Sequence, residues 1–296
     1  MVLRRRRDGT QVRDLPGLRR VMPYLMRTRT ESVVYFPQRL EVDRLLAWLE
    51  EVNLGRSRQE QVTLFDVLLT AIARTVRLRP ETNRFVVGRR TYQRDEIAIT
   101  FVVKKQLRDE AAESEMRLVF TGLETVDDVR RLVRDAVSRG RGEAKKGDDE
   151  LIDFFMSWPR PLLNAINRGL QVLDYHNALP ARLADAIPLY TSIYVVNAGS
   201  IGIDPPFHHL YEHGTASAFV SIGRVSQQPV VDEAGQVVAR SVLDLVHTLD
   251  ERATDGFYFA KTAEVLRRLV EEPELLARPE VSVAEIVPDW PPRHQR

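Results

Sequence analysis

A charged turn at residues 249–256 joins two segments whose hydrophobic patterns differ. It reads Leu249-Asp250-Glu251-Arg252-Ala253-Thr254-Asp255-Gly256. Residues 237–249, before the turn, have the composition of a strand, and residues 257–270, after it, place apolar side chains on one face of a helix that ends near Pro273. The turn therefore predicts a strand–turn–helix unit.

The rest of the chain uses the same two patterns. A helix is predicted over residues 63–79, with Thr63 as its N-cap and Pro80 at its end, and another begins at Thr125 with Asp128 in its first turn. Short β-type runs fill residues 85–87, 91–93, 97–103, 116–120, 189–196 and 218–224. Strands interleaved with helices, without an internal repeat, predict one α/β domain in two layers: a sheet and the helices that cover it.

The composition excludes several classes of function. Lys and Arg total 43 against 42 Asp and Glu, so the formal net charge of +1 gives no field that would gather nucleic acid or anionic lipid. The chain has no cysteine, hence no disulfide, no thiolate metal site and no cysteine nucleophile. It also has no apolar run long enough for a transmembrane segment, and its basic start lacks the hydrophobic part of an export signal, so we expect a cytoplasmic protein.

We divide the chain into a basic flexible tail (residues 1–18), a main domain (19–279) and an irregular C-terminal arm (280–296). The arginines at 4–7 are expected to be solvated, with contact to a phosphate or a lipid headgroup as the alternative. Within the main domain, residues 151–188 form an apolar amphipathic region broken by Pro159 and Pro161. A neighbouring subunit or the same core should cover it, rather than a membrane surface, because its polar face is poor in lysine.

Several motifs, in the right order, resemble the catalytic domain of the 2-oxoacid dehydrogenase acyltransferases, which are related to chloramphenicol acetyltransferase. Residues 19–26 and 34–36 resemble the family's opening helix and first strand, and residues 79–83 its helix ending in Pro-Glu-x-Asn. Residues 195–202, Val-Val-Asn-Ala-Gly-Ser-Ile-Gly, resemble its Ser-Asn-x-Gly strand end. The turn at 250–256 aligns with the signature Asp-His-Arg-x-x-Asp-Gly, which is the most specific match.

The resemblance implies a two-layer α/β fold like that of chloramphenicol acetyltransferase, and a homotrimer with its active site in a channel between two subunits. Coenzyme A or acyl-coenzyme A would be a substrate there, with no tightly bound cofactor, and Asn197, Gly199 and Ser200 would contact it. Trimers of the family can assemble further, and an active relative is a candidate partner. Residues 104–117 lack the family's Gly-Leu-x-x-Pro-Val stretch, so the resemblance does not extend to lipoyl binding.

Two catalytic positions of the family are replaced. The signature histidine, the family's general base, corresponds to Glu251, and a glutamate with a reference pKa of ~4.3 is roughly four units too acidic to deprotonate a thiol. The family's hydroxyl donor to the oxyanion corresponds to Val196, which cannot donate, unless a shifted register lets Ser200 replace it. We therefore expect inactivity or altered chemistry, that is, a pseudoenzyme or a modified acyltransferase.

The remaining motif residues suggest a structural loop. Asp255 and Gly256 are retained, and by resemblance Asp255 pairs with an arginine, for which Arg252 is the candidate. Glu251 is interpreted as a carboxylate that stabilises the loop, with a catalytic base of raised pKa as the alternative. His247 lies on an apolar strand face and is interpreted as a core histidine, with a displaced catalytic base as the alternative.

A second group of histidines lies at residues 208–213, His-His-Leu-Tyr-Glu-His. His209 and His213 have the i, i+4 spacing of a helical metal site, but the prolines before them and Gly214 after them favour a loop, so we predict no metal site. Two rival functions remain beside the degenerate acyltransferase: a trimeric scaffold that docks a partner through residues 151–188, and an acyltransferase that uses Glu251 or His247 on an alcohol or amine. No basic-aromatic motif suggests nucleic-acid binding.

Overall fold

The computed structural model describes residues 6–104, 113–141, 157–180, 183–184, 187–232 and 234–290. The strands are β1 (Gly9–Gln11), β2 (Val33–Glu41), β3 (Arg84–Val87), β4 (Arg90–Arg94), β5 (Ile97–Lys104), β6 (Glu113–Phe120), β7 (Ile193–Asn197), β8 (Ala218–Val231) and β9 (Val237–Asp250). The α-helices are α1 (Gly17–Leu25), α2 (Asp43–Val52), α3 (Leu64–Leu78), α4 (Val126–Arg141), α6 (Arg160–Tyr175), α8 (Gly256–Glu271) and α9 (Val283–Ile286). Single 3-10 turns are η1 (Thr30–Ser32), η2 (Pro80–Asn83), η4 (Ala198–Ile201) and η5 (Pro273–Ala277).

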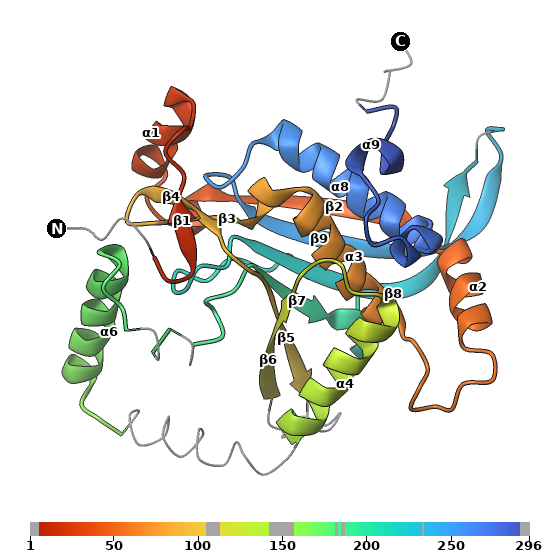
Figure 1. The fold of residues 1–296 in the computed structure, drawn as a ribbon, viewed down its shortest axis with the longest axis horizontal. Coiled ribbons are helices and arrows are strands. Elements are labelled where there is room, and N and C mark those ends of the chain that lie inside the picture. Colours follow the sequence, from red (N-terminus) through yellow and green to blue (C-terminus); the bar gives the residue numbers. More distant parts are fainter. Residues whose placement is uncertain are drawn as a thin grey trace.

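The main sheet is mixed and has six strands in the order β2-β9-β8-β7-β5-β6. β7 runs parallel to both of its neighbours, β5 and β8, whereas the other pairs are antiparallel. Helices α3 and α8 lie together across one face of this sheet, and a small three-stranded sheet, β1-β4-β3, lies beside it (Figure 1). The predicted α/β architecture is confirmed, including the strand–turn–helix unit β9–α8.

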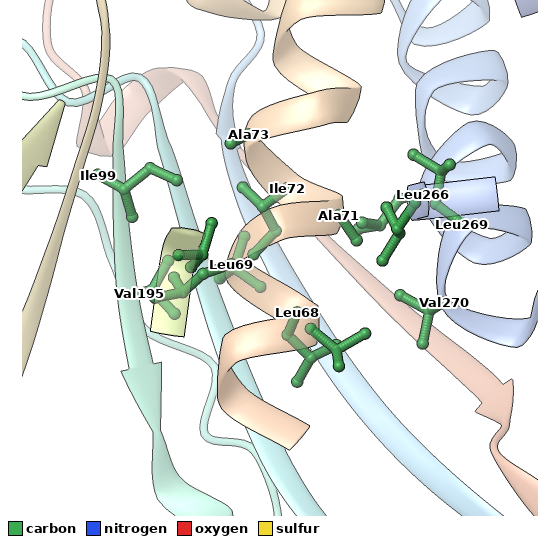
Figure 2. Close-up of a cluster of buried hydrophobic side chains, with 14 of the residues drawn as sticks. Leu68, Leu69, Ala71, Ile72, Ala73, Ile99, Val195, Leu266, Leu269 and Val270 are labelled. Atoms are coloured by element: carbon green, nitrogen blue, oxygen red, sulfur yellow. The ribbon is translucent and has the colours of Figure 1, made fainter. Parts of the chain in front are cut away.

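Helix α3 forms the centre of the core. Thr63 is its N-cap in a capping box with Asp66, which fixes the start that the sequence predicts. Leu68, Leu69 and Ile72 are buried because α3 packs both on the sheet and against α8. Figure 2 shows their partners: Ile99 of β5, Val195 of β7, and Leu266, Leu269 and Val270 of α8.

The opposite face of the sheet carries a smaller apolar cluster. Tyr194 of β7 stacks on Phe219 of β8 with ring centroids 5.2 Å apart, and Leu210, from the loop before β8, packs against both. Side chains alternate along a strand, so Val196 points to this second face whereas Val195 points to α3.

The N-terminal segment differs from the expected flexible tail. β1 pairs with β4, and Arg6 is buried, with ion pairs of 2.8 Å both to Asp8 and to Asp174 of α6. Two carboxylates make burial of a guanidinium tolerable, which a count of arginines in the sequence does not show. Residues 1–5 of the predicted tail lie outside the described residues.

The C-terminal arm also differs from expectation, because part of it belongs to the core. Ser282 caps the short helix α9 in a capping box with Glu285, and Val281, Ile286 and Val287 are buried in the cluster around α3 and α8. The predicted boundary at residue 279 is therefore not an edge of the hydrophobic core. Residues 291–296 lie outside the described residues.

The apolar region contains one continuous helix, α6, with Pro161 in its first turn rather than at a break. None of the residues of α6 is buried, and the helix stands apart from the α3–α8 layer (Figure 1). The core therefore does not cover this part of the region, and burial by a neighbouring subunit stays a prediction. Residues 151–156 lie outside the described part of the chain. No helix of the described residues is long and apolar enough to cross a membrane.

Candidate functional site

The turn after β9 is held by a buried ion pair. Asp250, at the end of β9, accepts hydrogen bonds from Arg252 Nε at 2.8 Å and Nη2 at 2.7 Å, and from the Ser32 hydroxyl at 2.9 Å. Arg252 Nη1 also donates to the carbonyl oxygen of Met26. Both charged side chains are almost completely buried. Arg252 thus fixes the turn and connects it to the segment that precedes β2.

The partner predicted for Asp255 is wrong. Asp255 pairs with Arg19 of α1, at 3.4 Å, and not with Arg252, which is occupied by Asp250. Its carboxylate also caps α8 by accepting the Tyr258 backbone N–H at 2.7 Å. Arg19 donates a further hydrogen bond to the carbonyl oxygen of Glu251. The sequence placed Arg19 in the opening helix, but it gave no indication that this helix contacts the turn after β9.

Glu251 lies at the exposed tip of the turn. Its backbone N–H donates to the Ser32 carbonyl at 2.9 Å, and its own carbonyl accepts from Arg19, so the main chain at this position is fixed. Gly256, the first residue of α8, is also exposed. The Glu251 carboxylate, which stands where the family has a histidine, therefore projects into solvent from a backbone that hydrogen bonds hold in place.

His247 lies inside the core, as one of the two interpretations held. It is 4% exposed, with Phe36 and Phe259 against its ring at centroid distances of 6.1 and 5.8 Å. Its Nε2 is 2.8 Å from Gln38 Oε1, and because an amide oxygen only accepts, Nε2 carries the proton. Burial lowers the pKa of His247 to about 4. The imidazole ring is therefore neutral and packs in the interior against Phe36 and Phe259.

Residues 197–202 form a compact turn after β7. Asn197 caps η4 by accepting the Ser200 backbone N–H at 3.1 Å, and the Ser200 hydroxyl donates back to the Asn197 carbonyl at 2.7 Å. A Cβ on Gly199 would overlap the Gly223 carbonyl oxygen of β8, so only glycine permits this approach. Ser200 is exposed, but its hydroxyl proton is engaged locally, and Val196 is half-buried against Tyr194 and its neighbours.

The two groups of predicted site residues lie well apart along the main sheet. Asn197 pairs with Ile222 of β8, which pairs with Leu245 of β9. Glu251 is six residues further along β9 than Leu245, which at ~3.3 Å per residue is roughly 20 Å. One chain therefore does not bring Asn197, Gly199 and Ser200 together with Glu251 and Asp255.

The histidines at 208–213 do not form a helix. His208 stacks on Phe219 with ring centroids 4.2 Å apart, the His209 Nδ1 is 3.0 Å from the Leu210 carbonyl, and His213 contacts Gln171 of α6. Each ring thus has a separate protein neighbour. Across the ranges that the structure describes, no group of three metal-ligating side chains gathers in one place.

Comparison with known proteins places this arrangement in a class. Residues 190–278, from β7 to the end of η5, match the family model of the 2-oxoacid dehydrogenases acyltransferase (catalytic domain). A probable dihydrolipoamide acetyltransferase from Listeria monocytogenes superposes with a TM-score of 0.58 at 12% identity, over 93% of this chain and 99% of that one. The cubic core of a pyruvate dehydrogenase multienzyme complex gives 0.60 at 13% identity, over 90% of this chain and 95% of that one.

The dihydrolipoamide acetyltransferase of Azotobacter vinelandii gives a TM-score of 0.59 at 14% identity, over 90% of this chain and 95% of that one. A serine, a histidine and an asparagine are named in the catalytic mechanism of that enzyme. This chain has the fold of these acyltransferase cores, and its residues 190–278 resemble their catalytic domain in sequence. The resemblance expected from the motifs is thus confirmed.

Proposed function

We propose that this protein forms a homotrimer that binds coenzyme A or an acyl-thioester between two subunits and does not catalyse ordinary transacylation. We call residues 197–200 the first half-site and residues 251–256 the second half-site. The distance between them is the observation on which this proposal rests. Residues 197–200 and residues 251–256 lie roughly 20 Å apart along the sheet of one chain, at ~3.3 Å per strand residue. A head-to-tail ring would place the first half-site of one copy against the second half-site of the next.

Exposed apolar side chains at both half-sites support such a ring. Ile201 is 58% and Ile203 48% exposed at the turn after β7, and Phe257 is 66% and Leu25 67% exposed beside the charged turn. Two separate apolar patches on one chain suit a heterologous contact, in which the first patch of one copy covers the second patch of the next. Closure of the ring at three subunits follows the assembly that the resemblance implies.

The chemistry of the described residues argues against ordinary transacylation. Glu251 offers a carboxylate where the related enzymes use an imidazole, and carboxylates are too acidic to deprotonate a thiol efficiently. His247 is buried, neutral and hydrogen-bonded to Gln38, so it cannot reach a bound thiol. Val196 has no hydroxyl for an oxyanion, and Ser200 donates its proton to Asn197.

Calorimetric titration of coenzyme A and acetyl-coenzyme A tests the proposal, with the mass of the same sample measured by light scattering. We expect saturable binding and a mass three times the 33.9 kDa of the chain. Ser200→Trp should block the channel and abolish binding, whereas Leu54→Trp, at an exposed position after α2, should not. A stable trimer that binds neither ligand would contradict the proposal and favour a scaffold.

A further inference from the structure

A cavity of about 730 Å³ lies between α6 and the body of the protein, and Arg252 of the charged turn is among its lining residues. Its walls come from the segment between α1 and β2, the β3–β4 hairpin tip, α6 and the residues that follow it, and the loop before β8. Small-molecule sites typically measure ~300–1,000 Å³. Helix α6, which the core does not bury, thus forms one wall of a space large enough for a small organic ligand.

Polar contacts and close packing hold these walls in place. A Cβ on Gly88, at the hairpin tip, would overlap the Tyr175 carbonyl oxygen at the end of α6. Arg6 pairs with Asp174 at 2.8 Å, and Asn177 donates to the Tyr92 hydroxyl at 2.8 Å. The C-terminal half of α6 is therefore tethered to the small sheet, and the cavity has a fixed shape on this side.

The acidic groups of the cavity are satisfied within the protein. Asp174 has its partner in Arg6. Burial opposes ionisation of Glu212, but hydrogen bonds from the Thr30 hydroxyl and from the backbone N–H groups of Thr30 and Arg29 outweigh it, so the pKa of Glu212 lies below its usual value. Neither carboxylate needs a cation from a ligand.

Two arginines of the cavity remain without an anionic partner. Arg29 donates to the carbonyl oxygens of Glu212 and Gly214, and Arg252 pairs with Asp250. Arg27 and Arg89 also line the cavity, and within the described residues neither guanidinium has a hydrogen bond or an ion pair. The Arg89 guanidinium lies over the Tyr24 ring at 5.2 Å.

The backbone of Arg89 is in the left-handed region, with φ of 60°, next to Gly88 at 57°. The two residues form the connection between β3 and β4, where glycine, asparagine or aspartate would meet this requirement at lower cost. An arginine in this conformation is uncommon, and such strain gathers at binding sites. The strained residue here carries one of the two unpaired guanidinium groups.

We propose that this cavity binds a small organic carboxylate that carries an apolar body. Arg27 and Arg89 would bind the carboxylate, because a guanidinium presents parallel N–H donors that match its two oxygens. Leu170, Leu179 and Ile187, which also line the cavity, would contact the apolar body. This site borders the charged turn through Arg252, but its ligand-binding groups, Arg27 and Arg89, are not residues of either half-site, and its occupation requires neither coenzyme A nor the trimer.

The test is titration of the full chain with 3-phenylpropionate and with its uncharged amide. We expect saturable binding of the acid and at least tenfold weaker binding of the amide, since one charge-assisted contact is worth about a factor of ten or more. Arg27→Gln and Arg89→Gly should each weaken binding of the acid about tenfold. Arg89→Gly also relieves the backbone strain, so the variant should fold at least as stably as the wild type.

Arg168→Gln is the matched control, because Arg168 lies on the exposed surface of α6 and does not line the cavity. It should bind the acid as the wild type does. Leu170→Trp, which fills the cavity from a helix without buried residues, should abolish binding and leave the melting temperature unchanged. Equal affinity for the acid and the amide, or no effect of the two arginine variants in folded protein, would overturn the proposal.

Discussion

At the scale of single residues, the buried pair of Asp250 and Arg252 is the most sensitive point of the candidate site. Asp250→Asn keeps the shape of the side chain but leaves the Arg252 guanidinium buried without a counter-charge. Breaking a buried ion pair from one side costs about 3–5 kcal/mol. We expect a loss of that order in the free energy of unfolding, measured by urea denaturation.

Asp244→Asn is the control for this variant, because Asp244, on the same strand as Asp250, forms a partly exposed ion pair of 2.9 Å with Arg39 of β2. Exposed pairs contribute about 0–1 kcal/mol, so this variant should change stability little. Similar losses in the two variants would mean that the pair at the turn is not desolvated. The difference between the two losses in the free energy of unfolding measures how much burial of the Asp250–Arg252 pair contributes to the stability of the turn that carries Glu251.

His247 should make the protein less stable in acid. Burial lowers its pKa to about 4, from a usual value near 6.5, so between these values the unfolded chain binds a proton that the folded chain does not. The free energy of unfolding should therefore fall as pH decreases from about 6.5 to about 4, by roughly 3 kcal/mol in total. Above about pH 6.5 His247 is neutral in both the folded and the unfolded state, so the protein has its full stability there and this loss is absent.

Urea denaturation of the wild type and of His247→Gln at several pH values measures the part of this pH dependence that comes from His247. The fall in the free energy of unfolding should disappear in His247→Gln and should remain in His176→Gln, whose histidine is exposed after α6. An unchanged pH dependence in His247→Gln would show that His247 is accessible to protons in the folded state. In that case its role as a displaced base would have to be reconsidered.

At the scale of secondary-structure elements, local sequence signals predicted most of the fold. The Thr63 cap, the strand alternation of residues 237–249 and the helix after Asp255 all lie within a few residues of the boundaries they determine, and the structure has them. The failures concern contacts between distant segments. Nothing near Asp255 in the sequence indicates that α1 brings Arg19 to it, and the arginines of residues 4–7 do not reveal Asp174 of α6.

The end of β7 offers a test of one such contact. Gly199→Ala should destabilise the protein by about 1–3 kcal/mol, because its Cβ would overlap the backbone of Gly223 on β8 and neither backbone can move without disturbing the sheet. Gly169→Ala places its Cβ in open space on α6 and should be neutral or stabilising by up to about 1 kcal/mol. Thermal denaturation of both variants measures the difference, and equal melting temperatures would mean that β7 and β8 separate easily at this point.

At the scale of the whole molecule, the proposed channel depends on how copies of the chain meet in the proposed trimer. The sequence motifs predict both half-sites, but no local pattern states whether two motifs share one cavity or lie far apart along a sheet. The strand register shows that they lie apart, since Asn197 aligns with Leu245 through Ile222. Only a neighbouring subunit can then complete a site that contains both.

The absence of cysteine from the chain allows this to be tested directly. In the double variant Ser200→Cys, Glu251→Cys, the two thiols of one chain are roughly 20 Å apart along the sheet, at ~3.3 Å per residue, which is too far for a disulfide or a short bis-maleimide. In a head-to-tail ring each thiol instead meets the other kind on the next copy, so denaturing electrophoresis should show covalent dimers and trimers. Each single variant has only one kind of thiol and should stay monomeric on the gel. A double variant that also stays monomeric, although its light-scattering mass is that of a trimer, would show that the subunits meet elsewhere and that the half-sites do not form a common channel.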